Sequence, residues 1–152
     1  CYANRIPTLC FTGDAAVEED YFLSSIGWAS TKKLPIIFVV EDNNLSILTE
    51  KKVRRNWEIH DVAKAFKMKA FDIDDDPQDI LSCLDFEEGI FAEPMLLNIK
   101  TNRMFWHAGA GIDDPDIFDR HMSFGEAFTL DYREDIQNKY NNFVSEVWRK
   151  YL

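Results

Sequence analysis

Residues 35–40, Pro-Ile-Ile-Phe-Val-Val, form a run without a polar or charged side chain. In an extended strand, successive side chains point to opposite faces, so this run is apolar on both faces. Such a strand has to be covered on both sides. This is typical of the central strand of a parallel sheet with helices packed on its two faces. The run therefore predicts an α/β fold.

The rest of the pattern agrees with this prediction. The other predicted elements are strands at residues 7–12, 69–73 and 95–99, and helices at 17–32, at 59–66, from Asp76-Pro77 onward and along the C-terminal segment. Alternating strands and helices imply parallel strands joined by right-handed crossovers. We expect an α/β fold with a mostly parallel sheet, helices on both faces, a helical C-terminus, and one domain over residues 1–152.

The composition argues against two classes of partner. The formal net charge is −10, so phosphate backbones and anionic membrane surfaces would repel the chain. No apolar run approaches the roughly 20 residues that a membrane-spanning helix needs. We therefore expect neither nucleic acid nor membrane as a partner. A bound phosphate group would need local compensation from a metal ion or a helix N-terminus.

The cysteines indicate a reducing compartment. Cys1, Cys10 and Cys83 are an odd number without repeated spacing, which argues against a disulfide framework. We expect a cytoplasmic protein, or one of the mitochondrial matrix if the source is eukaryotic. Because the sequence starts at Cys1 and not at Met, we expect a fragment or one part of a larger enzyme.

Polar residues follow two predicted strands at their carboxyl ends. Gly13-Asp14 ends the first strand, and Glu41-Asp42-Asn43-Asn44 ends the second, about one βαβ unit later. If these strands are neighbours, Asp14 and Asn43 meet at the edge where open α/β sheets bind ligands. Mg²⁺ prefers such oxygen ligands, and the start of the following helix could seat a diphosphate. The structural alternative is that Asp14 caps a helix and the asparagines form a turn.

The same residues carry a resemblance to a known family. Gly13-Asp14-Ala15-Ala16 and the segment 33–43, Lys-Leu-Pro-Ile-Ile-Phe-Val-Val-Glu-Asp-Asn, resemble the thiamine-diphosphate motif. They are most similar to the alpha-type subunit of the decarboxylating component of 2-oxoacid dehydrogenase complexes. The similarity covers roughly residues 6–121 and includes residues 61–66, residues 71–76 and a histidine-bearing loop at 103–115.

The resemblance implies a site for thiamine diphosphate and Mg²⁺. It makes Asp14 and Asn43 the side-chain metal ligands and the backbone carbonyl of Leu45 the third protein ligand. His107 would bind the cofactor and steady reaction intermediates, so it is the candidate catalytic residue. The implied cofactor-binding residues are Gly13, Asp14, Ala15, Ala16, Asn43, Leu45 and His107.

The resemblance also implies an activity, the thiamine-diphosphate-dependent decarboxylation and dehydrogenation of a 2-oxoacid. This chain would supply the diphosphate half of the site. A pyrimidine-binding domain or beta-type subunit would complete it in a dimer or heterotetramer, and a lipoyl acyltransferase would accept the acyl group. Two alternatives remain. One is another thiamine-dependent enzyme, such as a transketolase or a 2-oxoacid:ferredoxin oxidoreductase. The other is a degenerate module that keeps the fold without the cofactor.

Several departures from the family pattern keep the degenerate module open. Ala15 stands where the family has Gly, and this would cost on the order of 1 kcal/mol if the position needed a positive φ. Ser24 and Gly27 stand where family members carry Glu and Asn. Asp42 replaces the first Asn of the usual pair, so Asn44 is a second candidate for the ligand role of Asn43.

Other polar groups have weaker interpretations. The basic cluster, Lys51, Lys52, Arg54 and Arg55, either orders over an anionic cofactor or forms a solvated loop. The acidic run of Asp72, Asp74, Asp75 and Asp76 is best explained by turn formation and helix capping. His107 has the alternative of packing beside Trp106. His60 and His121 receive no role.

Overall fold

The computed structural model describes residues 4–84, 86–87, 89–104 and 118–151. They divide into two compact units, Cys1–Ile117 and Phe118–Leu152. The expectation of one domain over residues 1–152, as part of a larger enzyme, stays a prediction. Among the described residues, no helix combines the length and the apolar character that crossing a membrane would require.

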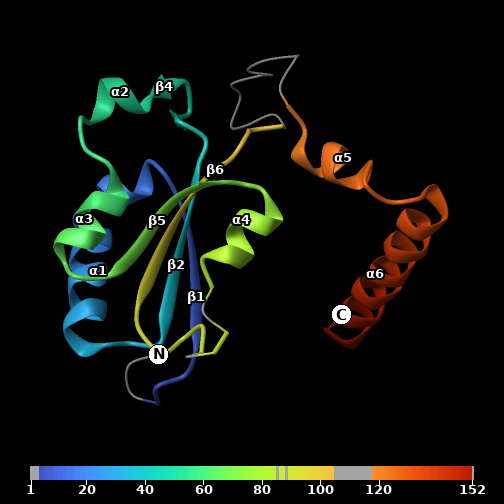
Figure 1. Cartoon of the computed structure of the whole chain (residues 1–152), viewed down its shortest axis with the longest axis horizontal. Helices are drawn as coiled ribbons and strands as arrows, with labels where there is room; N and C mark the ends of the chain where they lie inside the picture. The colour runs from blue at the N-terminus through green and yellow to red at the C-terminus, as the bar shows by residue number, and fades with distance from the viewer. Residues whose placement is uncertain (1–3, 85, 88, 105–117, 152) are drawn as a thin grey trace. The chain divides into compact units, whose positions relative to one another are not determined.

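A four-stranded parallel sheet forms the centre of the first unit (Figure 1). Its strands, in spatial order, are β1 (Thr8–Gly13), β2 (Ile36–Asp42), β6 (Met95–Lys100) and β5 (Lys69–Asp74). Every neighbouring pair is parallel, so all four strands end at the same edge of the sheet. The apolar run at 35–40 lies in β2, between β1 and β6, and the predicted α/β fold is confirmed.

Helices cover both faces of this sheet. The 3₁₀ turn η1 (Ala16–Glu18) and the helices α1 (Asp20–Lys32) and α3 (Ile59–Ala65) pack on one face. On the other face, the short helix α4 (Pro77–Ser82) and the segment after it pack in one apolar cluster with β5, β6 and β2. As predicted, Asp76 caps α4, because its carboxylate accepts the backbone N–H of Gln78 at 2.8 Å. The two apolar layers hold the sheet between them.

The strand β1 is less buried than its sequence suggests. Leu9 is 53% exposed and Phe11 is 63% exposed, whereas the alternate residues point toward α1. The prediction of a buried strand is wrong here, because β1 is an edge strand and the described apolar cluster on that face includes residues of β2, β6 and β5 but none of β1. An apolar sequence run alone does not distinguish an edge strand from a central one.

The helix predicted at 17–32 is interrupted. The turn η1 buries Val17 completely, and Glu19 then takes extended backbone angles, φ −76° and ψ 145°, before α1 begins at Asp20. The segment directly after Asp14 is therefore a single tight turn and not the start of the long helix. Glu18 stays near the carboxyl edge of the sheet, where it has ion-pair partners.

The segment after β2 is more ordered than predicted. It contains a two-stranded hairpin, β3 (Leu45–Ser46) and β4 (Thr49–Glu50), followed by the helical turn α2 (Lys51–Arg54). Figure 1 shows α2 and β4 beyond the carboxyl ends of β1 and β2. This short segment contributes most of the positive charge near that edge.

The second unit contains α5 (Arg120–Gly125) and α6 (Leu130–Tyr151). The predicted helical C-terminus is confirmed. Phe128 contacts Phe124 edge-on and stacks on Tyr132, with ring centroids 5.5 Å and 5.3 Å apart. The aromatic contacts pack the chain between the two helices against the first turns of α6.

Leu96 provides a test of this core. Its side chain is fully buried on the central strand β6. The variant Leu96→Ala should lower the free energy of unfolding by about 2–5 kcal/mol, since it leaves a cavity between sheet and helices. Urea denaturation followed by circular dichroism measures this change. Leu48→Ala, on the exposed hairpin turn, is the matched control and should change stability by less than about 0.5 kcal/mol.

Candidate functional site

The carboxyl ends of β1 and β2 lie side by side. Gly13 is paired with Glu41 in the register of the two strands, and the Asp14 backbone N–H donates to the Glu41 carbonyl at 3.3 Å. Asp14 is only 2% exposed. A Cβ built on Gly13 would meet no atom within 4 Å, so the exposed face of β1 is open at that residue. The parallel pairing therefore brings the Asp14 and Asn43 segments to one edge, as expected.

Two local turns arrange the residues after β2. The Asn44 backbone N–H donates to Asp42 Oδ1, and the Leu45 N–H donates to Asn43 Oδ1, each at 3.0 Å. Asn44 has a φ of 65°, in the left-handed region that Asn tolerates better than most residues. The amide oxygen of Asn43 accepts one N–H here and retains a second lone pair. The turn thus fixes its side chain without using all of its capacity as a ligand.

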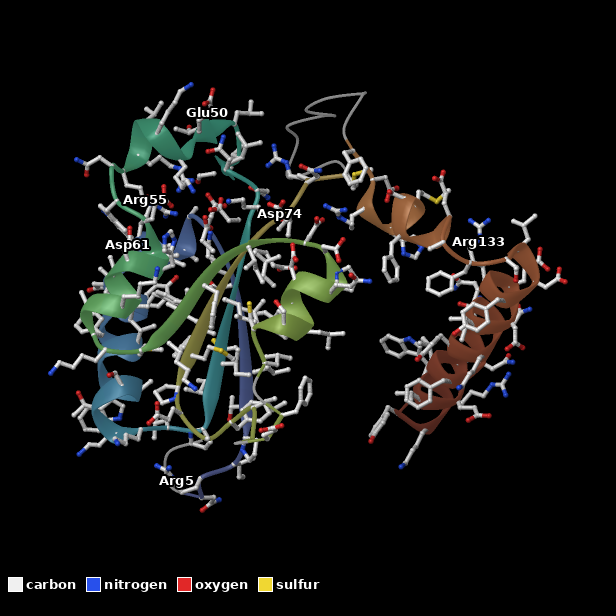
Figure 2. All side chains as sticks on the ribbon, viewed as in Figure 1. Arg5, Glu50, Arg55, Asp61, Asp74 and Arg133 are labelled. Atoms are coloured by element: carbon white, nitrogen blue, oxygen red, sulfur yellow. The ribbon has the colours of Figure 1, made fainter. Side chains whose placement is uncertain are left out.

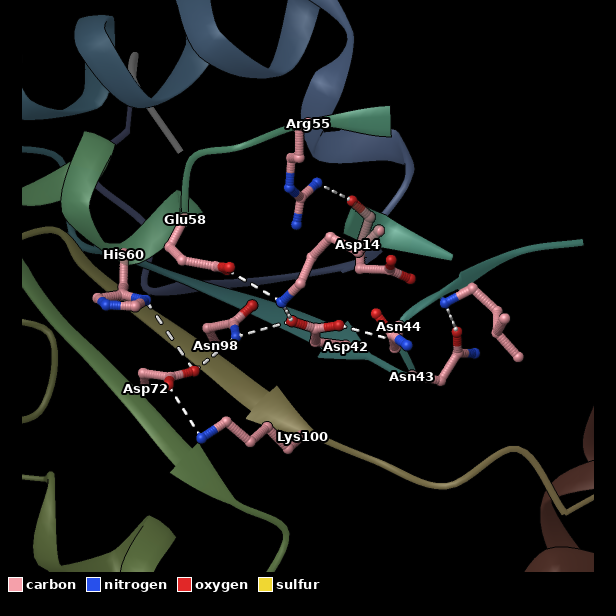
Figure 3. Close-up of polar contacts among 12 residues, drawn as sticks. Asp14, Asp42, Asn43, Asn44, Arg55, Glu58, His60, Asp72, Asn98 and Lys100 are labelled. Carbon is pink, nitrogen blue, oxygen red and sulfur yellow. Dashed lines mark hydrogen bonds and ion pairs between the residues drawn. The ribbon is translucent and has the colours of Figure 1, made fainter. Parts of the chain in front are cut away.

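Asp42 is the centre of a buried polar network (Figure 3). Its Oδ2 accepts from Lys51 Nζ at 2.7 Å and from the side-chain amide of Asn98 at 3.1 Å. Lys51 also donates to Glu58 at 2.9 Å. Asp42 therefore joins β2 to the central strand β6 and to the basic segment above the sheet edge.

The same network continues to β5. The Asn98 amide donates to Asp72 Oδ1 at 2.8 Å, and Lys100 Nζ lies 3.0 Å from Asp72 Oδ2. His60 Nδ1 lies 4.0 Å from Asp72 Oδ1. Asp72 is therefore more than a turn residue, and His60 has a carboxylate nearby. Sequence reasoning missed this network, because Asn98, which links Asp42 to Asp72, lies between the apolar residues Leu97 and Ile99 of its strand.

The basic cluster is divided between ion pairs and solvent. Arg54 Nη2 lies 2.5 Å from Asp14 Oδ2, and its Nη1 bonds Glu18. Arg55 Nη1 donates to the Asp14 carbonyl at 2.5 Å and to Glu18 at 2.9 Å. Lys52 is exposed and pairs with Glu50. The solvated-loop interpretation is thus wrong for Arg54 and Arg55, which contact Asp14 and Glu18 at the sheet edge. Figure 2 labels Arg55.

Burial and neighbouring groups at this edge shift the pKa values of two carboxyl groups. Burial raises the pKa of Asp14, the Arg54 hydrogen bond offsets this only in part, and the nearby Asp42 raises it further. Burial also acts to raise the pKa of Asp42, but the hydrogen bonds from Lys51, Asn98 and the Asn44 N–H outweigh it and hold that pKa below its ordinary value. Burial thus dominates the pKa of Asp14, whereas the donors around Asp42 outweigh it.

The departures from the family pattern have structural explanations. Ala15 has a φ of −78° and a ψ of −35°, ordinary for any residue, so the alanine brings no backbone strain. Ala16 is the first residue of η1. A side chain on Gly27 would only touch the Phe66 ring, and the Ser24 hydroxyl bonds the Tyr21 carbonyl within α1. Residues 105–115 of the histidine-bearing loop, with Trp106 and His107, lie outside the described residues.

The residues at this edge fit a magnesium ion in chemical type. Asp14, Asn43 and Leu45 offer a carboxylate, an amide carbonyl and a backbone carbonyl, which are the hard oxygen donors that Mg²⁺ takes. One feature opposes an incoming cation, because the Asp14 carboxylate is already paired with Arg54.

Comparison with known proteins matches residues 3–126 to the dehydrogenase E1 component. The chain belongs to this family. The alpha subunit of the pyruvate dehydrogenase E1 component from Porphyra purpurea is 32% identical over 116 residues, which covers 72% of this E1-family chain and 32% of the relative. The chain thus spans about a third of that relative's length. The resemblance to an alpha-type E1 subunit is confirmed.

A solved structure shows the same fold in another enzyme. A transketolase from Campylobacter jejuni subsp. jejuni NCTC 11168 matches with a TM-score of 0.54 and 23% identity over 61% of this chain and 15% of that protein. At this identity the match shows the fold of the E1-family chain and no more. The arrangement of strands and helices is therefore shared more widely than the E1 family.

The pair of Asp42 and Lys51 can be tested by a double-variant cycle. Lys51→Met leaves the buried Asp42 carboxylate without its main cation and should lower the free energy of unfolding by about 1–3 kcal/mol. Adding Asp42→Asn removes the uncompensated charge and should recover part of this loss. Urea denaturation of the four proteins gives the coupling. Equal losses for Lys51→Met and for the exposed control Lys52→Met would contradict the network.

Acid stability should depend on Asp72. Burial acts to raise its pKa, but the hydrogen bonds from Asn98 and Lys100 outweigh this and lower it. A lowered pKa contributes stability above the unfolded value of about 4, and this is lost as the pH falls through the folded value. Between about pH 5 and 3, the unfolding free energy should fall less in Asp72→Asn than in the wild type, with Lys100→Met in between. If the unfolding free energies of the wild type and Asp72→Asn, measured by urea denaturation, fall equally with pH, Asp72 does not contribute to acid stability.

Proposed function

We propose that this chain supplies the diphosphate- and magnesium-binding half of the active site of a thiamine-diphosphate-dependent 2-oxoacid dehydrogenase. Its membership of the dehydrogenase E1 component family supports this. The observation that carries the proposal is the pairing of β1 with β2, which puts the Asp14 and Asn43 segments at one sheet edge. Oxygen donors of the kind that Mg²⁺ requires are thus available from both strands.

The chain's own residues would hold the cofactor at its diphosphate end. Asp14, Asn43 and the Leu45 carbonyl would bind the metal, and Ala15 and Ala16 would offer backbone N–H groups to the diphosphate. When bound, thiamine diphosphate supplies the electron sink for decarboxylation of the 2-oxoacid. Asp42 would keep the Asn43 turn in position, since its carboxylate is bonded on three sides.

Other parts of the active site would come from elsewhere. We propose that a pyrimidine-binding domain or beta-type subunit completes the site, in a dimer or heterotetramer, and that a lipoyl acyltransferase takes the acyl group. His107 would act near the cofactor or substrate. Without such a partner the 152-residue chain should bind the cofactor weakly and should not turn over. The expected compartment is the cytoplasm, or the mitochondrial matrix in a eukaryote.

A second candidate is a structural module of the same fold that has lost the cofactor. The ion pair between Arg54 and Asp14 favours it, because an arginine takes the charge that a metal ion would otherwise balance. The ordinary backbone angles of Ala15 count against it, since they remove one reason to regard the motif as damaged. Binding measurements distinguish the two candidates.

Calorimetric titration with thiamine diphosphate and Mg²⁺ tests the proposed function. The wild-type chain should bind, and Asp14→Asn should weaken binding by at least about ten-fold, because it removes the only charged metal ligand of the proposed set. Asn43→Ala should have a comparable effect. Asn44→Ala should change the affinity little. A ten-fold loss of affinity in Asn44→Ala instead of Asn43→Ala would assign the ligand role to Asn44.

Asp79→Asn is the matched control, since it removes one exposed carboxylate from α4, on the opposite face of the sheet from η1 and α1. It should leave the affinity unchanged. If the wild type and Asp14→Asn both give no heat of binding at any cofactor concentration, the second candidate is favoured. Decarboxylation of a 2-oxoacid by the isolated chain would instead contradict the need for a partner.

A further inference from the structure

Two largely buried arginines bond Asp14, the residue whose carboxylate is proposed to bind the metal. Arg54 Nη2 lies 2.5 Å from Asp14 Oδ2, and Arg55 Nη1 donates to the Asp14 carbonyl at 2.5 Å. Both guanidinium groups also bond Glu18. The side chains of Arg54, Arg55 and Asp14 are 11%, 2% and 3% exposed. The contact is therefore an internal ion-pair cluster and not a surface pair.

This cluster is electrically balanced without a metal ion. Asp14 and Glu18 contribute two negative charges, and Arg54 and Arg55 contribute two positive charges. A divalent cation that arrived alone would add two positive charges beside two guanidinium groups that are largely shielded from water. Repulsion between like charges is strong in such an environment. A diphosphate arriving with the metal would restore the balance.

The arginines also retain unused hydrogen-bond donors. Within the described residues, Arg54 Nε and both Nε and Nη2 of Arg55 are buried and have no hydrogen-bond partner. Buried donors are nearly always satisfied in folded proteins, so three such nitrogens near one carboxylate indicate a missing acceptor. Guanidinium N–H groups match the oxygens of phosphate groups, which they bind in pairs.

We propose that Arg54 and Arg55 make this site accept a divalent metal and a diphosphate only as a pair. Arg54 occupies Asp14 while the metal is absent. Metal binding requires Arg54 to leave this carboxylate, and the diphosphate then supplies acceptors for the released guanidinium and for the unused donors of Arg55. The ligand class is a metal-bound diphosphate ester, and a bare divalent cation is bound weakly. This inference depends on the proposed function.

The test measures binding of Mn²⁺, a spectroscopic substitute for Mg²⁺, to the 152-residue chain by the loss of the free-ion electron paramagnetic resonance signal. Titrations are run with and without thiamine diphosphate, and a protein-free titration is subtracted to account for Mn²⁺ bound by the free diphosphate. The wild type should bind Mn²⁺ at least ten-fold more tightly when the cofactor is present. Arg54→Gln should bind Mn²⁺ alone at least ten-fold more tightly than the wild type does, and its affinity should depend less on the cofactor.

Lys52→Gln is the matched control. It removes one positive charge from the same helical turn, but Lys52 is 75% exposed and pairs only with Glu50 among the ion pairs described. Its Mn²⁺ affinity should equal that of the wild type. Arg54→Met repeats the test with a side chain that cannot donate, and circular dichroism and thermal unfolding identify whichever Arg54 variant is folded.

The outcomes separate this inference from the proposed function. If the wild type and the folded Arg54 variant bind Mn²⁺ alone equally well, and Asp14→Asn abolishes binding, the metal site stands and the role of Arg54 is wrong. If both bind only with the cofactor and to the same extent, the role of Arg54 is again wrong. If no variant binds Mn²⁺ with or without thiamine diphosphate, the inference and the proposed function both fail.

Discussion

The Asp42 carboxylate is the interaction on which the carboxyl edge of this sheet depends. One oxygen receives the Asn44 N–H, and the other receives Lys51 and the Asn98 amide. A buried carboxylate is costly unless it is paired and hydrogen-bonded, so these three donors must stay in place while Asp42 is ionised. In doing so they hold the turn after β2, the central strand β6 and the segment containing α2 to one another.

Asp14 lies at the end of the neighbouring strand but in a different electrostatic state. Its carboxylate has Arg54 as its charged partner, and burial raises its pKa despite that contact. Asp42 is satisfied by partners from three elements, whereas the Asp14 carboxylate bonds Arg54. Asp42 thus stabilises the sheet edge, whereas Asp14 could exchange its arginine partner for a metal ion. This difference agrees with the roles proposed for the two residues.

The sequence predicted much of the fold and part of the site. The run at 35–40, which is apolar on both faces, and the alternation of strands and helices were sufficient to predict a parallel α/β sheet. The spacing of the motif was sufficient to predict the family. It did not predict the break at Glu19 or the exposure of β1, because apolar periodicity does not report edge position. It missed Asn98, since a single polar residue in an apolar strand has no local pattern.

The sequence by itself determined the class of fold and the polar residues that follow β1 and β2, because burial periodicity and turn chemistry are local properties. Only the tertiary structure decided which charges meet. Arg54 and Asp14 are 40 residues apart, and Asn98 is 56 residues from Asp42. Their contacts exist because β6 inserts between β2 and β5 and α2 folds over the sheet edge. Strand order brings such groups together, and residue spacing along the chain does not encode it.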